Sequence, residues 1–291
     1  MPLDRPGEDF AGAQSVERSM ALLMTVAKGH AAGASLGDVV AATGLKQPTA
    51  RRLLLALIRA GLIEQDDASR RYFLGPECYV LGTIATERYG VHRLAMDSLQ
   101  RLAKMSQDTA FITVRNGLHG VCLERQEGTY PIRSYVLSVG DRFPLGVSAG
   151  TLAILAALPD AEIELVLRSY GKAFAERYPL LTREVICGLI GDARRKGYAL
   201  NPGLVFPGSW GIGVAIHDAH GDPIAALSIA AIESRMTEDH QAQLAPALSE
   251  EARLIETRLH EIRSLRTAVA PLQRRQSRYA KTASARKMPP A

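Results

Sequence analysis

The sequence predicts a mixed α/β fold of two domains: a mostly helical N-terminal domain with a β-hairpin wing, and a C-terminal domain with an antiparallel sheet. The first observation is a pair of short amphipathic segments at residues 35–59, joined by the turn Thr43-Gly44-Leu45, which is typical of a helix-turn-helix. The second is a change of hydrophobic period, from helical to alternating, near residue 111. With 291 residues, of which 47% are hydrophobic, the chain is long enough to form two apolar cores.

The first helix of the motif is expected to begin after Ser35, whose hydroxyl can cap the amide groups of the first turn. Leu36, Val39 and Val40 follow at helical spacing and form one apolar face. Gly44 ends the helix, because glycine adopts a left-handed backbone without a steric clash. A tight turn is therefore predicted directly after this helix.

The second helix is predicted to have Gln47 at its cap and Pro48 at its first position, where a missing amide hydrogen costs nothing. Its inner face is formed by Leu53, Leu54, Leu57 and Ile58. Four polar residues gather at its N-terminal end and are expected to face outward, namely Gln47, Thr49, Arg51 and Arg52. In a helix-turn-helix this end enters the major groove of DNA, where Arg pairs with guanine and Gln with adenine. The alternative is two ordinary surface helices with a solvated arginine pair.

A β-hairpin wing is predicted directly after the second helix. Residues 61–64 form its first strand, residues 66–69 its turn and residues 70–74 its returning strand. Arg70 and Arg71 lie at the tip and on the returning strand, where they can reach a phosphate backbone or a minor groove. The predicted DNA-binding residues are therefore Gln47, Thr49, Arg51, Arg52, Arg70 and Arg71.

Helical segments precede the predicted sheet. Residues 78–89 are apolar at Tyr79, Val80, Ile84 and Ala85, which suits a linker helix that packs either on another subunit or on its own chain. A second helix is predicted at 92–104. The first strands are predicted at 111–115 and 120–124, as a hairpin around Asn116-Gly117, and at 132–136.

The remaining elements complete a mixed α/β order. We expect helices at 151–158 and 161–169, strands at 211–217 and 223–232, and a final helix from Thr237 to about Arg266. Pro246 either kinks the final helix or marks a later start. Beyond Pro271 the chain is polar and basic without apolar periodicity, so disorder is predicted. This tail either adds nonspecific DNA affinity or is a solvated extension.

Several short sequence motifs follow one another along the chain. The N-terminal ones are Gln14-Ser15-Val16-Glu17-Arg18 with Leu22-Leu23, Gly44-Leu45, Thr49-Ala50, Arg52-Leu53-Leu54, Gly61-Leu62-Ile63 and Tyr72-Phe73-Leu74-Gly75. The later ones are Asp141-Arg142-Phe143-Pro144-Leu145, Gly197-Tyr198, Gly211-Ile212-Gly213-Val214-Ala215 and Ala225-Ala226-Leu227-Ser228-Ile229. On these motifs, which cover about residues 14–262, the chain resembles IclR-type bacterial transcriptional regulators. The resemblance implies a winged helix-turn-helix, a linker helix and a GAF-like α/β effector-binding domain.

The resemblance also implies an effector site against the sheet of the second domain. Carried over residue by residue, the site comprises Ala149, Gly150, Asn201, Gly211, Ser228 and Ala230. Asn201 stands where an Asp is common and Ala230 where a Ser can occur, so one charge and one hydroxyl are lost. Phe206 and Trp210 lie nearby in the sequence and favour an aromatic or otherwise bulky carboxylate, unless both are plain core residues.

No catalytic residue, cofactor or metal ion is expected. His217 and His220 lie across a predicted turn without a third ligand at suitable spacing. Gly211-Ile212-Gly213 lacks the third glycine and the following helix of a dinucleotide-binding loop. Gly146-Val147-Ser148-Ala149-Gly150 has the spacing of a nucleophile elbow, but no acid and base partners are identifiable. A GAF-like hydrolase, or a small-molecule sensor without DNA-binding activity, is therefore the alternative function.

The distribution of charge and the cysteine content indicate where DNA affinity arises and in which cellular compartment the protein is expected. The net charge of +5 arises in the tail, because the chain after Pro271 holds six basic and no acidic residues and the rest carries about −1. DNA affinity must therefore come from local charge between Lys46 and Arg71. The scattered cysteines Cys78, Cys122 and Cys187 indicate a reducing cytosol. Without a signal peptide or a span of about 20 apolar residues, we expect a cytoplasmic protein with no membrane partner.

The predicted organisation is a disordered N-terminus at 1–12, a winged helix-turn-helix at 13–76, a linker helix at 77–91, an effector-binding domain at 92–266 and a basic disordered tail at 267–291. The expected function is that of a one-component transcriptional regulator and not of an enzyme. We expect it to bind a roughly palindromic double-stranded DNA operator as a homodimer or homotetramer, because one recognition helix reads only a few base pairs. A small organic acid is the expected effector.

Overall fold

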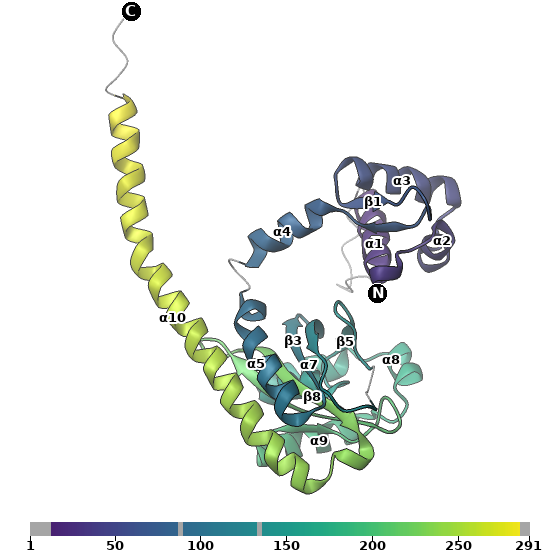
Figure 1. Cartoon of the computed structure of the whole chain (residues 1–291), viewed down its shortest axis with the longest axis vertical. Coiled ribbons are helices and arrows are strands. Elements are labelled where there is room, and N and C mark those ends of the chain that lie inside the picture. The colour runs from purple at the N-terminus through teal and green to yellow at the C-terminus, as the bar shows by residue number, and fades with distance from the viewer. Residues whose placement is uncertain (1–12, 87–89, 133–135, 286–291) are drawn as a thin grey trace, which may run out of the picture. The chain divides into compact units, whose positions relative to one another are not determined.

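The structure, a computed structural model, describes residues 13–86, 90–132 and 136–285. It divides into two compact units, residues 1–89 and residues 90–291 (Figure 1). The predicted disordered segment at 1–12 and residues 286–291 of the predicted tail lie outside the described residues. Within the described ranges, no helix is both long enough and apolar enough to span a membrane.

The first unit is mostly helical and carries a short antiparallel hairpin. Its elements are α1 (Gln14–Ala27), the 3₁₀ helix η1 (His30–Ala32), α2 (Leu36–Thr43), α3 (Gln47–Arg59), β1 (Ile63–Gln65), β2 (Tyr72–Leu74) and α4 (Pro76–Thr86). Strands β1 and β2 pair with Ile63 opposite Leu74. Ala34 extends this pairing through reciprocal backbone hydrogen bonds with Tyr72, of 2.8 and 2.9 Å. The predicted winged helix-turn-helix is confirmed.

Helix α2 begins and ends as its sequence predicts. The Ser35 hydroxyl accepts a hydrogen bond from the backbone N–H of Asp38 at 3.1 Å, and the Asp38 carboxylate accepts one from the N–H of Ser35 at 2.8 Å. The bond from the Ser35 backbone lowers the pKa of Asp38 below its usual value. Gly44 follows with a φ of 67°, a left-handed backbone that closes the helix.

Helix α3 begins one residue earlier than predicted. Lys46, with φ −63° and ψ 139°, is its cap, so Gln47 is the first helical residue and Pro48 the second. This start is compatible with proline, because the amide hydrogens of the first turn have no partner within a helix. The buried side of α3 joins residues of α1, α2 and the hairpin in one apolar core, including Leu22, Val39, Leu54, Leu57 and Ile63.

The second unit is an α/β domain. Among the described residues its sheet has six antiparallel strands in the order β5-β4-β3-β8-β7-β6. Its elements are α5 (Val91–Ser106), β3 (Thr109–Asn116), β4 (His119–Gln126), β5 (Arg142–Pro144), α6 (Ala149–Ala157), α7 (Asp160–Arg168), α8 (Lys172–Arg177), α9 (Arg183–Lys196), β6 (Ala199–Asn201), β7 (Ser209–His217), β8 (Pro223–Ile232), the 3₁₀ helix η2 (Glu233–Arg235) and α10 (Glu238–Ala285). The predicted α/β domain with an antiparallel sheet is confirmed.

The two faces of this sheet belong to two different cores. Ile112, Leu227 and Ile229 belong to a core completed by residues of α5 and α10. Phe111 and Ala226 alternate with them along β3 and β8 and belong to a core completed by α6, α7 and α9. The sheet is therefore covered by helices on both faces, which explains its almost continuous apolar strands.

Helix α6 lies close to the sheet because glycine residues face it. A Cβ atom at Gly213 would lie 3.0 Å from the Ala149 carbonyl oxygen, and one at Gly211 would lie 3.0 Å from the Ala149 side chain. A Cβ atom at Gly150 would lie 3.2 Å from Thr113 Oγ1. Side chains at these positions would push the helix away. The N-terminal end of α6 is thereby held against β3, β7 and β8.

Helix α10 is longer than the sequence predicts. Thr237 caps it as expected, since the N–H of His240 donates to Thr237 Oγ1 at 3.3 Å. The helix continues through Pro246 and through residues 267–285, so the prediction of a disordered tail is wrong for that stretch. Ala, Arg, Gln and Lys predominate there and favour helix, and lengthening an existing helix avoids the cost of nucleation.

The predicted strand at 132–136 also differs from the structure. Ile132 and Val136 are not in a strand, and residues 133–135 lie outside the described residues. The edge of the sheet beside β4 is formed by β5 instead, with Phe143 opposite Gly120. The segment that the resemblance marks at 141–145, and not the more apolar one before it, therefore supplies the edge strand.

Candidate functional site

Helix α3 has an apolar side in the core and a polar side in solvent. Its buried residues are Ala50, Leu54 and Leu57. On the other side lie four of the predicted DNA-binding residues, the exposed Gln47, Arg51 and Arg52 and the half-buried Thr49. Within the described part of the chain, neither Arg51 nor Arg52 forms a salt bridge. Both guanidinium groups are therefore available to bind phosphate or a base edge.

The tip of the wing carries Arg70 in an exposed position. Asp66 shapes the turn by accepting a hydrogen bond from the N–H of Ser69 at 2.7 Å. Arg70 follows with a positive φ of 57° and lies 3.8 Å from the fully exposed carboxylate of Asp67. Such an exposed ion pair contributes little, so the Arg70 side chain can exchange this partner for a phosphate.

Arg71 has a different environment from Arg70. Its Nε donates to the carbonyl oxygen of Ala32 at 2.7 Å, and its Nη2 donates to that of Gly33 at 3.0 Å. Nη2 also lies 3.4 Å from the carboxylate of Asp38, the residue that completes the cap of α2. Arg71 therefore connects the returning strand of the wing to the start of α2. These contacts occupy the guanidinium that is expected from the sequence to bind DNA.

Replacing Arg71 by alanine is expected to weaken the first unit, whereas replacing Arg70 is expected to weaken only DNA binding. Three contacts are lost in Arg71→Ala, at a cost of about 1–2 kcal/mol for a partly exposed charged group. Arg70→Ala should instead lower the slope of log affinity against log salt concentration by about 1, as the loss of one phosphate contact does. Melting curves and salt titrations of both variants check this. A reduced salt slope with unchanged melting in Arg71→Ala would contradict it.

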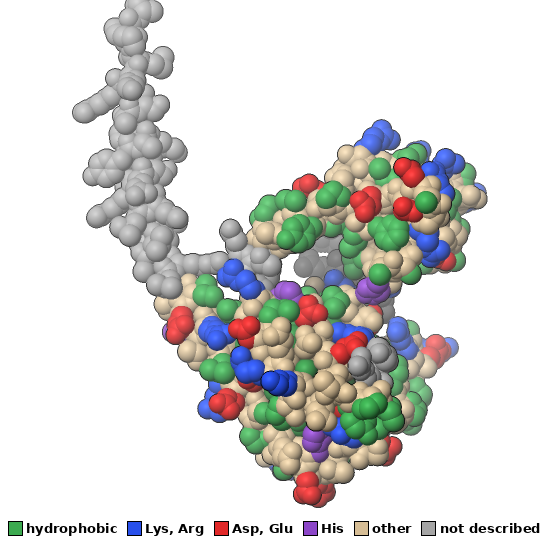
Figure 2. Space-filling model, in the orientation of Figure 1, with side chains coloured by type: hydrophobic (Ala, Val, Ile, Leu, Met, Phe, Trp, Pro, Cys, Tyr) green, Lys and Arg blue, Asp and Glu red, His purple; other side chains and the backbone are tan. Residues whose placement is uncertain are grey.

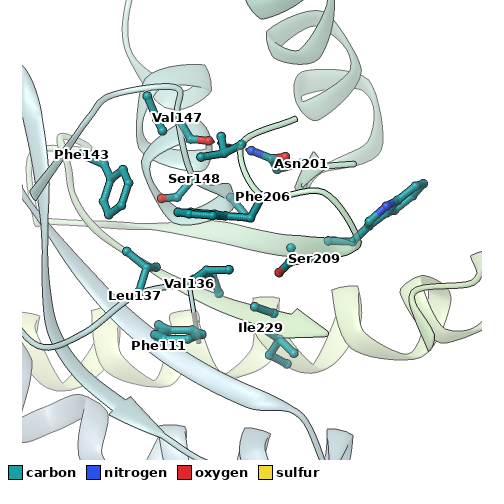
Figure 3. Close-up of a pocket in the computed structure, with 16 residues that line it drawn as sticks. Phe111, Val136, Leu137, Phe143, Val147, Ser148, Asn201, Phe206, Ser209 and Ile229 are labelled. Atoms are coloured by element: carbon teal, nitrogen blue, oxygen red, sulfur yellow. Dashed lines mark hydrogen bonds between the residues drawn. The ribbon is translucent and has the colours of Figure 1, made fainter. Parts of the chain in front are cut away.

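A small pocket, partly open to solvent, lies at the N-terminal end of α6 in the second unit (Figure 3). Its walls are mostly apolar and include the aromatic residues Phe111, Phe143, Phe206 and Trp210. The polar side chains that line it are Ser148, Asn201, Ser209 and Ser228. Among the described residues, no charged side chain lines the pocket. Such a cavity suits a small, largely apolar ligand with a few polar groups.

The pocket brings together most of the residues that the family resemblance implies. Ala149, Asn201, Gly211, Ser228 and Ala230 line it. Gly150 does not, because its Cα packs on the sheet, where a Cβ atom would lie 3.3 Å from Ser228 Oγ. Phe206 and Trp210 line the pocket as well.

The start of α6 provides free hydrogen-bond donors at the pocket wall, from Ala149, and directly behind it, from Gly150. The N–H of Thr151 donates to the Ser148 hydroxyl at 3.3 Å, and the N–H of Leu152 donates to the Ser148 carbonyl at 2.7 Å. The N–H groups of Ala149 and Gly150, both buried, have no acceptor among the described residues. The positive end of a helix with free N–H groups attracts an anion.

Ser228 presents a further free hydroxyl. Ser228 lines the pocket, and the residue as a whole is only 4% exposed. Its hydroxyl has no hydrogen-bond partner among the described residues. The hydroxyl oxygen itself is not fully buried, so a ligand in the pocket can reach it with a matching polar group. Together with the start of α6, Ser228 forms a polar end in an otherwise apolar pocket.

The hydroxyl of Ser148 does not have the surroundings of a nucleophile. It belongs to the cap of α6, where it lies 3.1 Å from Thr151 Oγ1. No His, Asp or Glu side chain contacts it in the part of the chain that is described, whereas an activated serine needs a base within hydrogen-bond distance. The described residues also contain no cluster of His, Cys, Asp or Glu that could hold a metal ion.

Several pocket residues were not found by the sequence reasoning. They are Phe111, Val136, Leu137, Phe143, Val147, Val205, Ser209 and Ile229. Phe111 lies directly opposite Ser228 on the neighbouring strand. A predicted pairing of β3 with β8 would therefore have placed Phe111 beside the expected site residue Ser228. Phe143 comes from the edge strand β5, which no period in the sequence distinguishes from a loop.

Comparisons with known proteins agree with this arrangement. The family model "Bacterial transcriptional regulator IclR C-terminal" matches residues 83–257, more than half of the chain, and "IclR helix-turn-helix domain" matches residues 15–67. The HTH-type transcriptional repressor AllR of Klebsiella pneumoniae is 28% identical over 259 residues, which are 88% of this chain and 94% of that protein.

Two solved structures with the same fold align with this chain over almost their whole length. An IclR transcriptional regulator from Alicyclobacillus acidocaldarius matches with a TM-score of 0.71 and 24% identity, over 84% of this chain and 98% of that one. An IclR homolog from Microbacterium hydrocarbonoxydans, crystallised with 4-hydroxybenzoate, matches with a TM-score of 0.70 and 23% identity, over 85% and 99%.

Proposed function

Because the chain belongs to the IclR family of bacterial transcriptional regulators, with a helix-turn-helix domain and an effector-binding domain, we propose that it binds a roughly palindromic operator under the control of a small aromatic carboxylate. The observation that carries the proposal is the free polar end of the apolar pocket. Ligand binding there changes DNA binding only if the DNA-competent and DNA-incompetent forms of the protein differ in their affinity for the ligand.

The proposed DNA contacts come from the open side of α3 and from the tip of the wing. Arg51 and Arg52 are exposed without ionic partners in the described structure. They are proposed either to contact base edges in the major groove or to bind the phosphates that position α3 in the groove. Gln47 and Thr49 lie beside them, and Arg70 is proposed to contact phosphate. Arg71 is left out of this set because its guanidinium binds the carbonyl groups of Ala32 and Gly33.

The proposed effector has a carboxylate and an aromatic ring. The N–H groups of Ala149 and Gly150 and the hydroxyl of Ser228 suit the carboxylate, because all three can donate to it without a charged partner. Phe111 and Phe206 suit the ring. The 4-hydroxybenzoate bound to the Microbacterium hydrocarbonoxydans protein of the same fold supports this class of ligand.

We also propose that the chain acts as a homodimer or as a homotetramer built from dimers. Helix α4 exposes a continuous set of apolar side chains, with Tyr79 at 80%, Ile84 at 62% and Leu81 at 52% exposed. Figure 2 shows hydrophobic side chains in green along the helix that Figure 1 labels α4. A second copy of the chain would bury this surface and would place two recognition helices on a two-fold operator.

A ligand screen tests the proposed effector. Benzoate, 4-hydroxybenzoate, pyruvate and acetate are added to the full chain, and the melting temperature and operator affinity are followed. We expect the two aromatic acids to raise the melting temperature and to change operator affinity. Ser228→Ala should lower aromatic acid affinity by about tenfold or more, as the loss of a hydrogen bond to a charged group does.

Thr113→Val provides a matched control for Ser228→Ala. Thr113 is buried on the neighbouring strand, and its hydroxyl has no partner either, but it does not line the pocket. The control keeps the shape of the side chain and should bind the acids as the wild type does. Equal affinity in Ser228→Ala and Thr113→Val would place the ligand elsewhere. Absence of sequence-selective DNA binding upstream of its own gene would favour a sensor that does not bind DNA.

A further inference from the structure

Both polar atoms of the Asn201 side chain are engaged inside the protein. Its Nδ2 donates to the carbonyl oxygen of Val147 at 2.6 Å, and its Oδ1 accepts from the backbone N–H of Leu204 at 3.1 Å. Asn201 is 6% exposed, and Figure 3 shows its amide nitrogen directed toward Val147. The side chain therefore connects the segment before α6 to the start of the 202–208 loop.

The 202–208 loop has a defined shape with a glycine near each end. Gly203 and Gly208 adopt positive φ angles of 74° and 77°. Between them, the carbonyl oxygen of Phe206 accepts a hydrogen bond from the N–H of Ser209 at 3.0 Å. The carbonyl of Gly208 accepts one from Glu233 at 2.9 Å. The C-terminal end of the loop is thus attached to the sheet, whereas its start is attached through Asn201.

Phe206 is carried by this loop into the pocket. Figure 3 shows its ring pointing into the cavity, beside Ser148 and facing the walls formed by Val136 and Leu137. The residue remains 41% exposed, so it is not a filled core position. Phe111 comes from a strand of the sheet, whereas Phe206 depends on the loop for its place. The position of the loop therefore decides how much of the cavity is open.

We propose that Asn201 is a positioning residue that holds the 202–208 loop, and that Phe206 on this loop sets the largest aromatic acid that the pocket accepts. The proposal rests on the proposed function for the identity of the ligands. Asn201 then acts through Val147, Leu204 and Phe206 and does not bind the effector itself.

The fluorescence of Trp210 can report whether the 202–208 loop is in place. Trp210 is the only tryptophan in the chain. A Cβ atom at Gly203 would lie 3.3 Å from Trp210 Nε1, which means that the indole packs against the loop. Release of the loop uncovers this edge of the indole. Tryptophan fluorescence therefore follows the loop without any ligand.

The first experiment measures acrylamide quenching of Trp210 in the full chain without ligand. Asn201→Ala removes both loop contacts, and Asn201→Asp removes only the donor to Val147 while keeping an acceptor for Leu204. We expect stronger quenching in both variants than in the wild type, with circular dichroism confirming that both are folded. Phe206→Ala keeps the Asn201 contacts and should be quenched as the wild type is. Unchanged quenching in both Asn201 variants would overturn the positioning role.

The second experiment compares the dissociation constants of benzoate and 2-naphthoate. Phe206→Ala should shift the ratio of the two constants toward 2-naphthoate by roughly tenfold, because a wall of the hydrophobic pocket has been removed. Asn201→Ala should shift the ratio in the same direction, since it frees the residue that forms this wall. If Asn201 bound the carboxylate directly, Asn201→Ala would weaken both acids equally and leave the ratio unchanged, which would overturn the proposal.

The two proposals fail in different ways. If the wild type binds neither acid, the proposed effector class is wrong, and the quenching experiment alone decides the role of Asn201. If the wild type binds benzoate but quenching and selectivity are unchanged in the Asn201 variants, the proposed function stands and the positioning role is wrong.

Discussion

The Gly75→Ala variant is expected to lose operator binding while keeping its response to aromatic acids. Gly75 is buried between the wing and α4, and a Cβ atom there would lie 2.1 Å from the carbonyl oxygen of Gly61 and 3.0 Å from the nitrogen of Ile63. Both neighbours are backbone atoms, so neither can rotate out of the way. We expect a loss of about 3 kcal/mol in the stability of the first unit, at the upper end of overpacking costs.

The backbone of Gly61 and Gly75 also forms hydrogen bonds, which is why the clash cannot relax cheaply. The N–H of Gly75 donates to Leu62 at 2.9 Å, and the carbonyl of Gly61 accepts from Glu77 at 3.1 Å. Moving either strand end breaks one of these bonds. The wing and the beginning of α4 would therefore lose their shape together.

Gly82→Ala is the matched control, because Gly82 lies in α4 and a Cβ atom there would meet nothing within 4 Å. An alanine inside a helix should stabilise it by about 0.5–1 kcal/mol relative to glycine. Melting curves, operator binding and benzoate binding are measured for both variants. Equal melting and equal operator affinity for Gly75→Ala and Gly82→Ala would contradict the prediction.

Replacing Arg51 or Arg52 by alanine is expected to weaken operator binding by about 1–3 kcal/mol for whichever of them reads a guanine. Both side chains are exposed on the N-terminal half of α3, which is the part of a recognition helix that reaches base edges. The loss should be larger on the operator than on random DNA, because a base contact contributes only at the matching sequence.

Arg59→Ala is the control on the same helix. Arg59 is exposed in the last turn of α3, where its Nε donates to the carbonyl of Leu55 at 3.4 Å. Its removal should change operator affinity by less than about 0.5 kcal/mol. Fluorescence anisotropy with operator and random duplexes at two salt concentrations gives the comparison. An equal loss on both duplexes assigns the arginine to phosphate, and no loss in either variant refutes the proposed interface.

The helix-turn-helix could be predicted from the sequence because its signals are local. Ser35 caps α2 through Asp38, three residues away, and Gly44 closes the same helix. The role of Arg71 could not be predicted, because its partners Ala32 and Gly33 lie 39 and 38 residues away in the chain. A sequence pattern shows that an arginine stands on a strand, but it does not show what folds against it.

The pocket was predictable only through the family resemblance. Ala149 and Ser228 come from a helix and a strand that are far apart in the sequence, and no period relates them. The resemblance placed Asn201 in the pocket but not its bonds to Val147 and Leu204. Residues 267–285 lack an apolar periodicity, so the sequence does not predict a helix there, although lengthening α10 needs no new nucleus.

None of the described residues that line the pocket carries a charge, which has a consequence for how DNA binding and acid binding respond to ionic strength. The proposed DNA contacts are made by exposed arginines, and affinity of this kind falls steeply with salt because each phosphate contact releases bound cations. An acid bound, as proposed, by the N–H groups of α6 and the Ser228 hydroxyl would form no ion pair with the described residues for mobile ions to screen. When the potassium concentration in the cell rises, the protein would therefore dissociate from DNA, whereas the fraction of pockets occupied by the acid would hardly change.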